Sequence, residues 1–301
     1  MKKILISDAI SPKAIDELRK VPDFEVDVKT GLNEEELVKT IQDYHSIVVR
    51  SATKVTSKVI EAANNLELII RAGIGLDNID LATAEKKGIK VANTPAATSI
   101  SVAELTFGLM LGAVRHISIA NMSMKAHKWE KKLFSGTELY GKTLGIIGLG
   151  RIGKEVAKRA LAFGMKVIAY DVIEIETDLD VKQVSFEELL FQSDIITIHI
   201  PLTKETKYLL SSKEFDLMKE GVILINIARG GVVEEEALLN ALNSGKVKAA
   251  AIDVWEKEPS DNFELIDHPN VIATPHLGAA AKEGQERAGL EAVKILKEYL
   301  L

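Results

Sequence analysis

Three polar side chains in the second half of the sequence could together oxidise a hydroxy acid. Arg229 precedes two glycines, Glu258 precedes Pro259, and His276 follows Pro275. Removing a hydroxyl proton while hydride leaves carbon requires a base that titrates near neutrality, as imidazole does. A carboxylate would stabilise the protonated imidazole, and a guanidinium would bind a substrate carboxylate through two hydrogen bonds. We therefore interpret His276 as the base, Glu258 as its support and Arg229 as the substrate-orienting group, although each taken singly could be structural.

A glycine-rich segment upstream is typical of a dinucleotide-binding loop. Gly148, Gly150 and Gly153 follow an apolar run and open a segment with helical periodicity, and a second apolar run ends at Asp171. In this G-x-G-x-x-G pattern the first glycine permits a tight turn, the second lets the main chain approach the pyrophosphate, and the third lets helix and strand pack closely. The amides at the start of the helix would then meet the phosphates.

The residue type at position 171 favours NAD over NADP. The carboxylate of Asp171 can accept hydrogen bonds from a ribose 2′-hydroxyl and would repel a 2′-phosphate. The segment Val172 to Asp180 contains no Arg or Lys that could receive such a phosphate. The alternative is that Asp171 is only a solvated turn carboxylate.

These side chains must be positioned by an alternation of short apolar runs and helical patterns. Strand, helix, strand repeats predict parallel sheets, and runs that are apolar at nearly every position predict strands buried on both faces. The fold class is therefore α/β, with two Rossmann-like doubly wound parallel-sheet domains. The predicted strands are Ile4–Ile6, Ile47–Val49, Leu68–Ile70, Leu144–Ile147, Val167–Tyr170, Ile195–Ile198, Val222–Ile225, Ala250–Val254 and Val271–Ala273.

The predicted helices suggest how the chain is divided. The stretch from Ser99 to about Trp129 is expected to be one long inter-domain helix, and Ser185 and Gly245 are expected to begin and end other helices. The last amphipathic helix, Lys282 to Tyr299, could pack back on the N-terminal domain and make it discontinuous. We predict a substrate (catalytic) domain of residues 1–95 and 280–301, and an NAD-binding domain of residues 96–279.

Composition excludes several classes of function. The formal net charge of −6 argues against a nucleic-acid partner, and the absence of cysteine excludes disulfides, thiolate nucleophiles and Cys-ligated metals. The histidines show no H-x-x-x-H spacing, so we expect no metal site. With neither a signal peptide nor an apolar run long enough to span a bilayer, the expected location is the cytoplasm, without membrane association.

The motifs around these residues resemble those of the D-isomer-specific 2-hydroxyacid dehydrogenases over essentially the whole chain. The matching segments run from Asn226 to Gly231, Glu258-Pro259, and from Pro275 to Gly278, together with the glycine-rich loop. The resemblance implies the same roles for the three polar residues. It also implies cofactor contacts by Arg151, Ile152, Asp171, Ile200, Pro201, Ala228, Arg229, Asp253, His276 and Gly278. For Asp253, the alternative is a strand-end carboxylate that only caps a loop.

Within this family the sequence is most similar to members that act on 3-phosphoglycerate. The similar segments imply substrate binding by Arg50, Ser51, Arg71, Gly73, Ile74 and Lys131. Such a set would build a local anion site on an acidic protein. Many of those members have Thr in place of Ile74 and Arg in place of Lys131, so a hydroxyl and a bidentate fork are lost. Arg50 and Arg71 could alternatively be plain surface residues at strand ends.

The resemblance leaves two other functions open. One is a glyoxylate or hydroxypyruvate reductase of the same family, and the other is an NAD-sensing binding protein, as some relatives of this fold are. A homodimer is also implied, with 99–129 as a contact segment. Longer relatives append a regulatory serine-binding domain after the position of Leu301, so we expect no serine feedback through such a domain.

Overall fold

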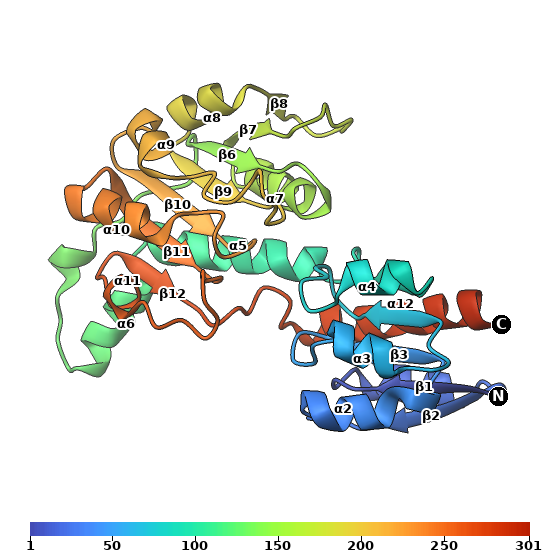
Figure 1. Cartoon of the computed structure of the whole chain (residues 1–301). Helices are drawn as coiled ribbons and strands as arrows, with labels where there is room; N and C mark the ends of the chain where they lie inside the picture. The colour runs from blue at the N-terminus through green and yellow to red at the C-terminus, as the bar shows by residue number, and fades with distance from the viewer. The chain divides into compact units, whose positions relative to one another are not determined.

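The computed structural model describes all 301 residues and divides the chain into two compact units. Unit 1 consists of Met1–Ser99 together with Ala279–Leu301, and unit 2 consists of Ile100–Gly278. Each unit is built on its own parallel sheet (Figure 1). The predicted fold class, two doubly wound parallel-sheet domains of which one is discontinuous, is confirmed.

Unit 1 contains a five-stranded sheet in the order β2-β1-β3-β4-β5, in which every pairing is parallel. This order places the reversal of strand sequence between β1 and β3, the type of position at which such sheets bind ligands. Its elements are β1 (Lys2–Ile6), α1 (Pro12–Arg19), β2 (Phe24–Val28), α2 (Glu34–Thr40), η1 (Ile41–Asp43), β3 (Ser46–Val49), α3 (Ser57–Ala62), β4 (Leu68–Arg71), α4 (Leu81–Lys86), β5 (Lys90–Asn93) and α12 (Lys282–Leu300).

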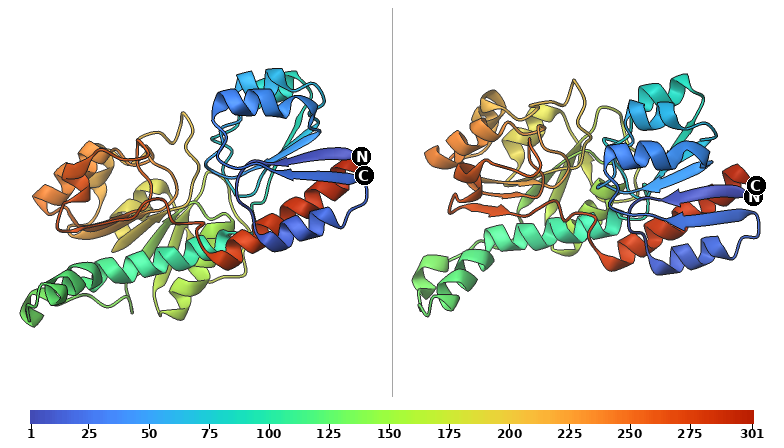
Figure 2. Two further views of the ribbon diagram at one scale, coloured as in Figure 1. Left: turned by 90° about the horizontal axis from the view of Figure 1, so that it is seen from below. Right: turned by 60° about the horizontal axis from the view of Figure 1, so that its bottom comes forward.

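The two faces of this sheet are covered by different helices because successive strand residues point to opposite sides. Ile4 and Ile6 belong to a core that includes side chains of α1 and α12, whereas Leu5 belongs to a core that includes side chains of α2, α3 and α4. The α12 helix lies beside α1 (Figure 2), and Gly289 permits the close approach, since a Cβ there would stand 2.9 Å from that of Ala14. The last helix therefore completes the core of the N-terminal sheet.

Unit 2 contains a seven-stranded parallel sheet in the order β12-β11-β10-β9-β6-β7-β8, whose strand sequence reverses between β6 and β9. Residues of α5 and α7 pack on one face and residues of α8, α9 and α10 on the other. Its elements are α5 (Ser99–Val114), α6 (Ile117–Lys125), η2 (Lys131–Phe134), β6 (Thr143–Ile147), α7 (Arg151–Ala162), β7 (Lys166–Tyr170), β8 (Lys182–Gln183), α8 (Phe186–Gln192), β9 (Ile195–Ile198), α9 (Ser212–Leu217), β10 (Val222–Asn226), α10 (Glu235–Ser244), β11 (Val247–Ile252), α11 (Phe263–Ile266) and β12 (Val271–Ala273).

Helix ends follow the local sequence. Ser185 accepts the Glu188 N–H at 3.1 Å at the start of α8, and Gly245 ends α10 with φ of 82°, as predicted. Three strands were not predicted: β2, β5 and β8. All three lie at sheet edges, where partly exposed strands lack the continuous apolar run that marks a central strand.

The prediction of one long helix from Ser99 to about Trp129 is wrong. The helix ends at Val114, His116 takes a left-handed conformation with φ of 56°, and α6 continues at an angle of 64°. No single helix is long and apolar enough to cross a membrane, and only this bent pair passes that test jointly by length and composition.

Candidate active site

The polar residues predicted to be catalytic follow three neighbouring strands of unit 2. Arg229 follows β10, Glu258 lies in the loop after β11, and His276 follows β12. Because all strands are parallel, these loops emerge at the same edge of the sheet, the carboxyl edge. Ligands of doubly wound sheets bind at this edge.

His276 and Glu258 form a direct pair. The Nδ1 of His276 lies 2.8 Å from Oε2 of Glu258, while Oε1 of Glu258 accepts the Trp255 N–H at 3.2 Å. Burial raises the pKa of Glu258, but the hydrogen bond and charge of His276, the Trp255 N–H and the charge of Arg229 outweigh it and hold the pKa below its usual value. Glu258 is therefore ionised at neutral pH, and the other ring nitrogen of His276 remains for a substrate.

The loop that carries His276 is held by Asp253, which is completely buried after β11. The main-chain carbonyl of Asp253 accepts the His276 N–H at 2.8 Å. Its carboxylate accepts the amides of Leu277 and Gly278 and the hydroxyl of Thr274, at 2.7, 2.8 and 2.6 Å. The observed contacts of Asp253 are thus those of a residue that caps a loop. They fix the position of His276, whose main chain has φ of 56°.

Arg229 belongs to a tight turn after β10. The buried Asn226 side chain holds this turn by accepting the Ala228 N–H and donating to the Arg229 carbonyl, both at 3.2 Å. Gly230 packs directly on the main chain after β11, because a Cβ there would overlap the carbonyl of Trp255. The turn therefore brings the Arg229 guanidinium close enough to act electrostatically on Glu258.

The glycine-rich loop joins β6 to α7 at the reversal of strand order. Gly148 has φ of 96° and lies against the carbonyl of His199, 2.7 Å from where its Cβ would be, and a Cβ on Gly153 would overlap the carbonyl of Gly148. A Cβ on Gly150, in contrast, would meet no atom within 4 Å. Gly150 begins α7 without a side-chain cap, so the first amides of a twelve-residue helix remain available to an anion. These residues fit a pyrophosphate group.

The remaining predicted cofactor residues surround this loop. Arg151 and Ile152 open α7, Asp171 follows β7, and Ile200 with Pro201 follows β9. The Oδ2 of Asp171 accepts the Leu149 N–H at 2.8 Å, so this carboxylate holds the loop. All of the predicted cofactor residues of unit 2 therefore lie in loops at one edge of the sheet or at the start of a helix that begins there.

Partly buried His199 backs the same loop and was not predicted. Its Nε2 lies 3.0 Å from the Thr197 hydroxyl, its Nδ1 is enclosed without a hydrogen-bond partner in the protein, and burial lowers its pKa to about 3. The imidazole is therefore neutral at physiological pH.

In unit 1, the predicted substrate residues Arg50 and Ser51 lie in the loop after β3. Asp8, at the carboxyl end of β1 and almost fully buried, holds this loop by accepting the amides of Arg50 and Thr53 at 2.6 and 3.1 Å and the Thr53 hydroxyl at 2.7 Å. Arg71, which ends β4, donates from Nε to the carbonyl of Arg50 at 3.3 Å. The two arginines thus lie next to each other.

The predicted residues Gly73 and Ile74 follow Arg71 in the next loop of unit 1. Asn93 donates to the Ile74 carbonyl at 2.5 Å, and the Arg71 guanidinium donates to the Gly75 carbonyl. Asn78 joins the two loops by donating to the Arg50 carbonyl at 2.8 Å. Sequence reasoning missed Asp8, Asn78 and Asn93; for Asp8 and Asn93, the rule that polar residues at strand ends build sites would have found them.

Lys131 is the one predicted substrate residue that belongs to unit 2, and it does not lie in any of the loops that carry the catalytic residues. It lies in η2, within a projecting segment of residues 115–135 that we call the arm. The arm returns to the sheet where Thr137 donates to the Val114 carbonyl at 2.8 Å and contacts Lys248, near the start of β11. That is the amino edge of the sheet, opposite to the catalytic loops.

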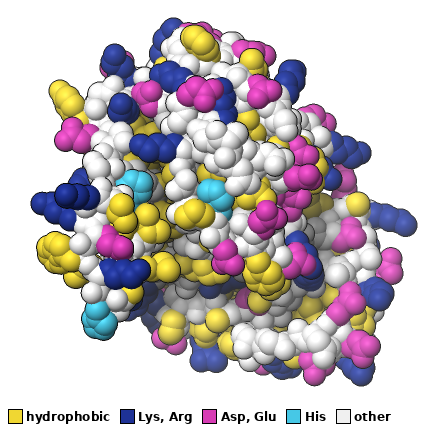
Figure 3. All heavy atoms as spheres, turned by 90° about the vertical axis from the view of Figure 1, so that its left-hand side faces the viewer, with side chains coloured by type: hydrophobic (Ala, Val, Ile, Leu, Met, Phe, Trp, Pro, Cys, Tyr) yellow, Lys and Arg dark blue, Asp and Glu magenta, His cyan; other side chains and the backbone are white.

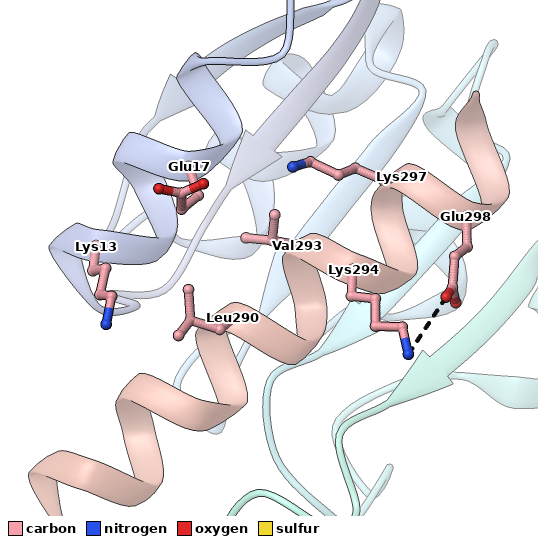
Figure 4. Close-up of a pocket in the computed structure, with 7 residues that line it drawn as sticks. All are labelled: Lys13, Glu17, Leu290, Val293, Lys294, Lys297 and Glu298. Atoms are coloured by element: carbon pink, nitrogen blue, oxygen red, sulfur yellow. Dashed lines mark ion pairs between the residues drawn. The ribbon is translucent and has the colours of Figure 1, made fainter.

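An open groove of about 380 Å³ lies elsewhere on unit 1, between α1 and α12 (Figure 4). Its charged residues are largely paired with one another or with neighbours, as Lys294 is with Glu298. None of the predicted site residues lines it. No group of three or more histidine, aspartate or glutamate side chains in the chain could hold a metal ion.

A doubly wound sheet with a glycine loop at its reversal point and an arginine, a glutamate and a histidine at its carboxyl edge is typical of nicotinamide-dependent dehydrogenases. Comparison with known families agrees, because residues 107–278 match the model of the D-isomer specific 2-hydroxyacid dehydrogenase NAD binding domain. The chain belongs to the D-isomer specific 2-hydroxyacid dehydrogenase family. It is an oxidoreductase with NAD as its cofactor.

Its relatives carry two different names. It is 51% identical over 300 residues to a hydroxypyruvate reductase of Thermotoga maritima, covering 98% of both chains. It is 49% identical over 304 residues to a D-3-phosphoglycerate dehydrogenase of Methanocaldococcus jannaschii, covering all of this chain but 58% of that protein. The chain thus spans little more than half the length of the phosphoglycerate dehydrogenases it matches.

Solved structures support the fold of the whole chain. The D-lactate dehydrogenase of Aquifex aeolicus complexed with NAD and lactic acid is 33% identical, with a TM-score of 0.87 over 99% of this chain and 95% of that one. The TT0316 protein of Thermus thermophilus is 36% identical, with a TM-score of 0.91 over 99% and 96%.

Proposed function

We propose that this protein oxidises 3-phospho-D-glycerate to 3-phosphohydroxypyruvate with NAD, the first step of the phosphorylated route to serine. The observation that carries the proposal is the adjacent pair Arg50 and Arg71 on loops that Asp8 and Asn78 hold in place. The Arg50 side chain and the Arg71 guanidinium, which lies 4.0 Å from the Asp77 carboxylate, would together supply the positive charge that a phosphate needs besides a carboxylate. Similarity to phosphoglycerate dehydrogenases supports the same reading.

Three residues of unit 2 would bind the substrate and move its hydroxyl proton. Arg229 would bind and orient the substrate carboxylate and carbonyl oxygen, and His276 would accept the hydroxyl proton at its free ring nitrogen. Glu258 would stabilise the imidazolium that forms, through the 2.8 Å contact with Nδ1. NAD, when bound, accepts the hydride released from the hydroxyl-bearing carbon. Residues Gly148, Gly150, Gly153 and Asp171 would hold it.

The second candidate is reduction of hydroxypyruvate or glyoxylate by the same residues. The 51% identity to a hydroxypyruvate reductase over nearly the full length of both chains favours it. So do Ile74, which has no hydroxyl to offer a phosphate, and Lys131, which lacks the bidentate fork of an arginine.

Rates with matched substrates decide between the two. We would follow NADH formation with 3-phospho-D-glycerate, and NADH consumption with 3-phosphohydroxypyruvate, hydroxypyruvate and glyoxylate, in wild type, Arg50→Ala and His276→Ala. The proposal predicts that kcat/KM is highest for the phosphorylated pair and that Arg50→Ala lowers it by roughly 100-fold for these substrates but much less for the others. Equal loss for both kinds of substrate, or turnover of unphosphorylated acids alone, would select the second candidate. NADH binding without turnover of any acid would indicate a binding protein.

We also propose a homodimer joined through the arm. The α6 helix buries none of its residues, and in the space-filling view of Figure 3 hydrophobic side chains lie at the surface among charged ones. Such exposed apolar surface is typical of an interface. Sedimentation of wild type and of a Met122→Glu, Trp129→Glu variant tests this, the variant being expected to be monomeric. The large hydrophobic side chains of the arm that are more than half exposed are Ile117, Met122, Met124, Trp129 and Leu133.

A further inference from the structure

Two glutamates outside the catalytic set exchange hydrogen bonds across neighbouring loops of unit 2. The Glu235 N–H donates to Oε1 of Glu256 at 2.9 Å, and the Glu256 N–H donates to Oε1 of Glu235 at 2.7 Å. Glu235 is the first residue of α10, and Glu256 lies in the loop after β11. The pair therefore fastens that loop to the start of a helix.

The remaining oxygens of both carboxylates are also occupied. Oε2 of Glu235 accepts the side-chain amide of Asn262 at 2.7 Å, and Oε2 of Glu256 accepts the Tyr208 hydroxyl at 3.0 Å. The Tyr208 N–H in turn donates to the Gly231 carbonyl at 2.7 Å. The network thus ties together the loops that follow β9, β10 and β11.

Two negative charges can lie together here because of the helix end. The residue before α10, Glu234, makes no side-chain cap, so Glu256 takes the place of the missing cap by accepting the Glu235 N–H. The partial positive charge at the start of a helix offsets the repulsion between the carboxylates.

The position of this clamp in the chain links it to catalysis. Glu256 is two residues from Glu258, and the residue before Glu256, Trp255, donates its N–H to Glu258 at 3.2 Å. His276, which pairs with Glu258, is held in place by buried Asp253 and not by the clamp. Glu258 is held by one main-chain donor, the N–H of buried Trp255, where Asp253 holds two amides and a hydroxyl, and the Glu258 side chain is 39% exposed. Its distance from His276 thus depends on how its loop is held.

We propose that Glu235 and Glu256 are positioning residues for the dehydrogenase reaction: by clamping the loop after β11 to α10, they keep Glu258 against His276 and so set the pH range of catalysis. This inference rests on the proposed role of His276 as the acid and base. Loss of the clamp lets Glu258 move away, and at a given pH less imidazolium is then available to protonate a keto acid.

Several charged or titratable groups surround Glu258 and the clamp. Glu258 faces His276 and Arg229. Around the clamp, Tyr208 faces Glu256, Glu234 and Glu235, and its pKa is raised by the hydrogen bond to Glu256 and by that charge. Lys207 lies over the Tyr208 ring, 5.0 Å from its centre. None of these neighbours other than Glu256 lies in the loop of Glu258.

The test is the pH dependence of keto-acid reduction in Glu256→Ala and Glu235→Ala. We expect the alkaline limb of kcat to move down by about one pH unit, a tenfold change in the protonated fraction, with little change in the Kd of NADH. Glu256→Gln keeps an acceptor oxygen, so the alkaline limb of this variant should lie close to that of the wild type. The matched control is Glu236→Ala, in the same helical turn but exposed and without a side-chain contact, and it should behave as wild type.

A double-variant cycle shows whether the clamp acts through Glu258. In a Glu258→Gln background, Glu256→Ala should cause no additional shift. Variants that are folded and less stable but have an unshifted pH profile would reduce the clamp to a structural feature and overturn the proposal. The titration of the His276 ring by NMR, assigned by its loss in His276→Asn, gives the same answer without turnover, so failure of the clamp and failure of the proposed reaction are separable.

Discussion

Asp253 and His276 are joined through both the main chain and the side chain of Asp253. The His276 N–H bonds to the Asp253 carbonyl at 2.8 Å, and the carboxylate of Asp253 accepts the two amides that follow His276. The carboxylate is fully buried, so each of these bonds is shielded from competing water. The imidazole that would move the proton is therefore located by a residue that need not touch the substrate.

Replacing Asp253 with Asn should lower kcat more than it lowers cofactor affinity. One acceptor oxygen becomes an NH2 donor that faces the Leu277 or Gly278 amide, and a buried unpaired donor costs about 1–3 kcal/mol. If this energy is lost from the transition state, kcat should fall by roughly 10- to 100-fold. Steady-state kinetics and fluorescence titration of NADH measure the two effects. Asp267→Asn, an exposed carboxylate, is the control, and equal loss of kcat and NADH affinity would instead make Asp253 chiefly a cofactor contact.

Asp171 should decide between the two nicotinamide cofactors. In Asp171→Ala, a 2′-phosphate no longer meets a negative charge, and a ribose hydroxyl loses its acceptor. The ratio of kcat/KM for NAD to that for NADP should fall by at least roughly 100-fold. The Leu149 N–H also loses its partner, so some loss of stability is expected. Exposed Asp180, changed to Asn, serves for comparison, and an unchanged ratio would leave Asp171 with the loop-holding role alone.

Partly buried His199, whose Nδ1 is enclosed, should make the folded state sensitive to acid. Its folded pKa, about 3, lies below the ordinary 6.5, so the unfolded chain binds a proton more readily throughout that interval. Stability is then complete above pH 6.5 and is lost as the pH falls, by about 1.4 kcal/mol per pH unit from this group. Urea denaturation of wild type and His199→Asn at pH 7, 6 and 5 should show that the difference between them changes in the variant's favour on acidification. Parallel curves would contradict the burial of an uncharged imidazole.

Gly230 should tolerate no side chain. A Cβ would overlap the Trp255 carbonyl, so Gly230→Ala must shift the turn of Arg229 or the loop of Glu258. We expect a loss of about 1–3 kcal/mol in unfolding free energy together with a fall in kcat. Gly108, in the middle of α5 with no atom within 4 Å of a Cβ, is the matched control, and its change to Ala should be neutral or stabilising. Full activity in Gly230→Ala would show that the contact is dispensable.

The central strands and the motif-bearing loops could be predicted from sequence because both are local. A strand buried on both faces, such as β10, contains a continuous apolar run, here Val222 to Ile225, and the glycines of the dinucleotide loop have fixed spacing. The edge strands lack that signal, and the helix break at His116 has no proline or glycine to mark it. The place of Asp8 at a strand end is a local signal, but its role in holding the loop of Arg50 and Thr53 is not, because those residues are distant from it in sequence. The Glu235 and Glu256 pair was missed for the same reason, since isolated glutamates in a charged sequence are usually solvated.

The discontinuity of unit 1 has a consequence for the newly made protein. Residues of α12 supply part of the hydrophobic core on one face of the N-terminal sheet. During synthesis on the ribosome, that face stays uncovered until residues 282–300 have left the exit tunnel, whereas all of the contiguous unit 2 has been translated earlier. The first strands to be made are thus enclosed only after unit 2 has been translated, and the nascent chain exposes apolar surface on this face until α12 is available.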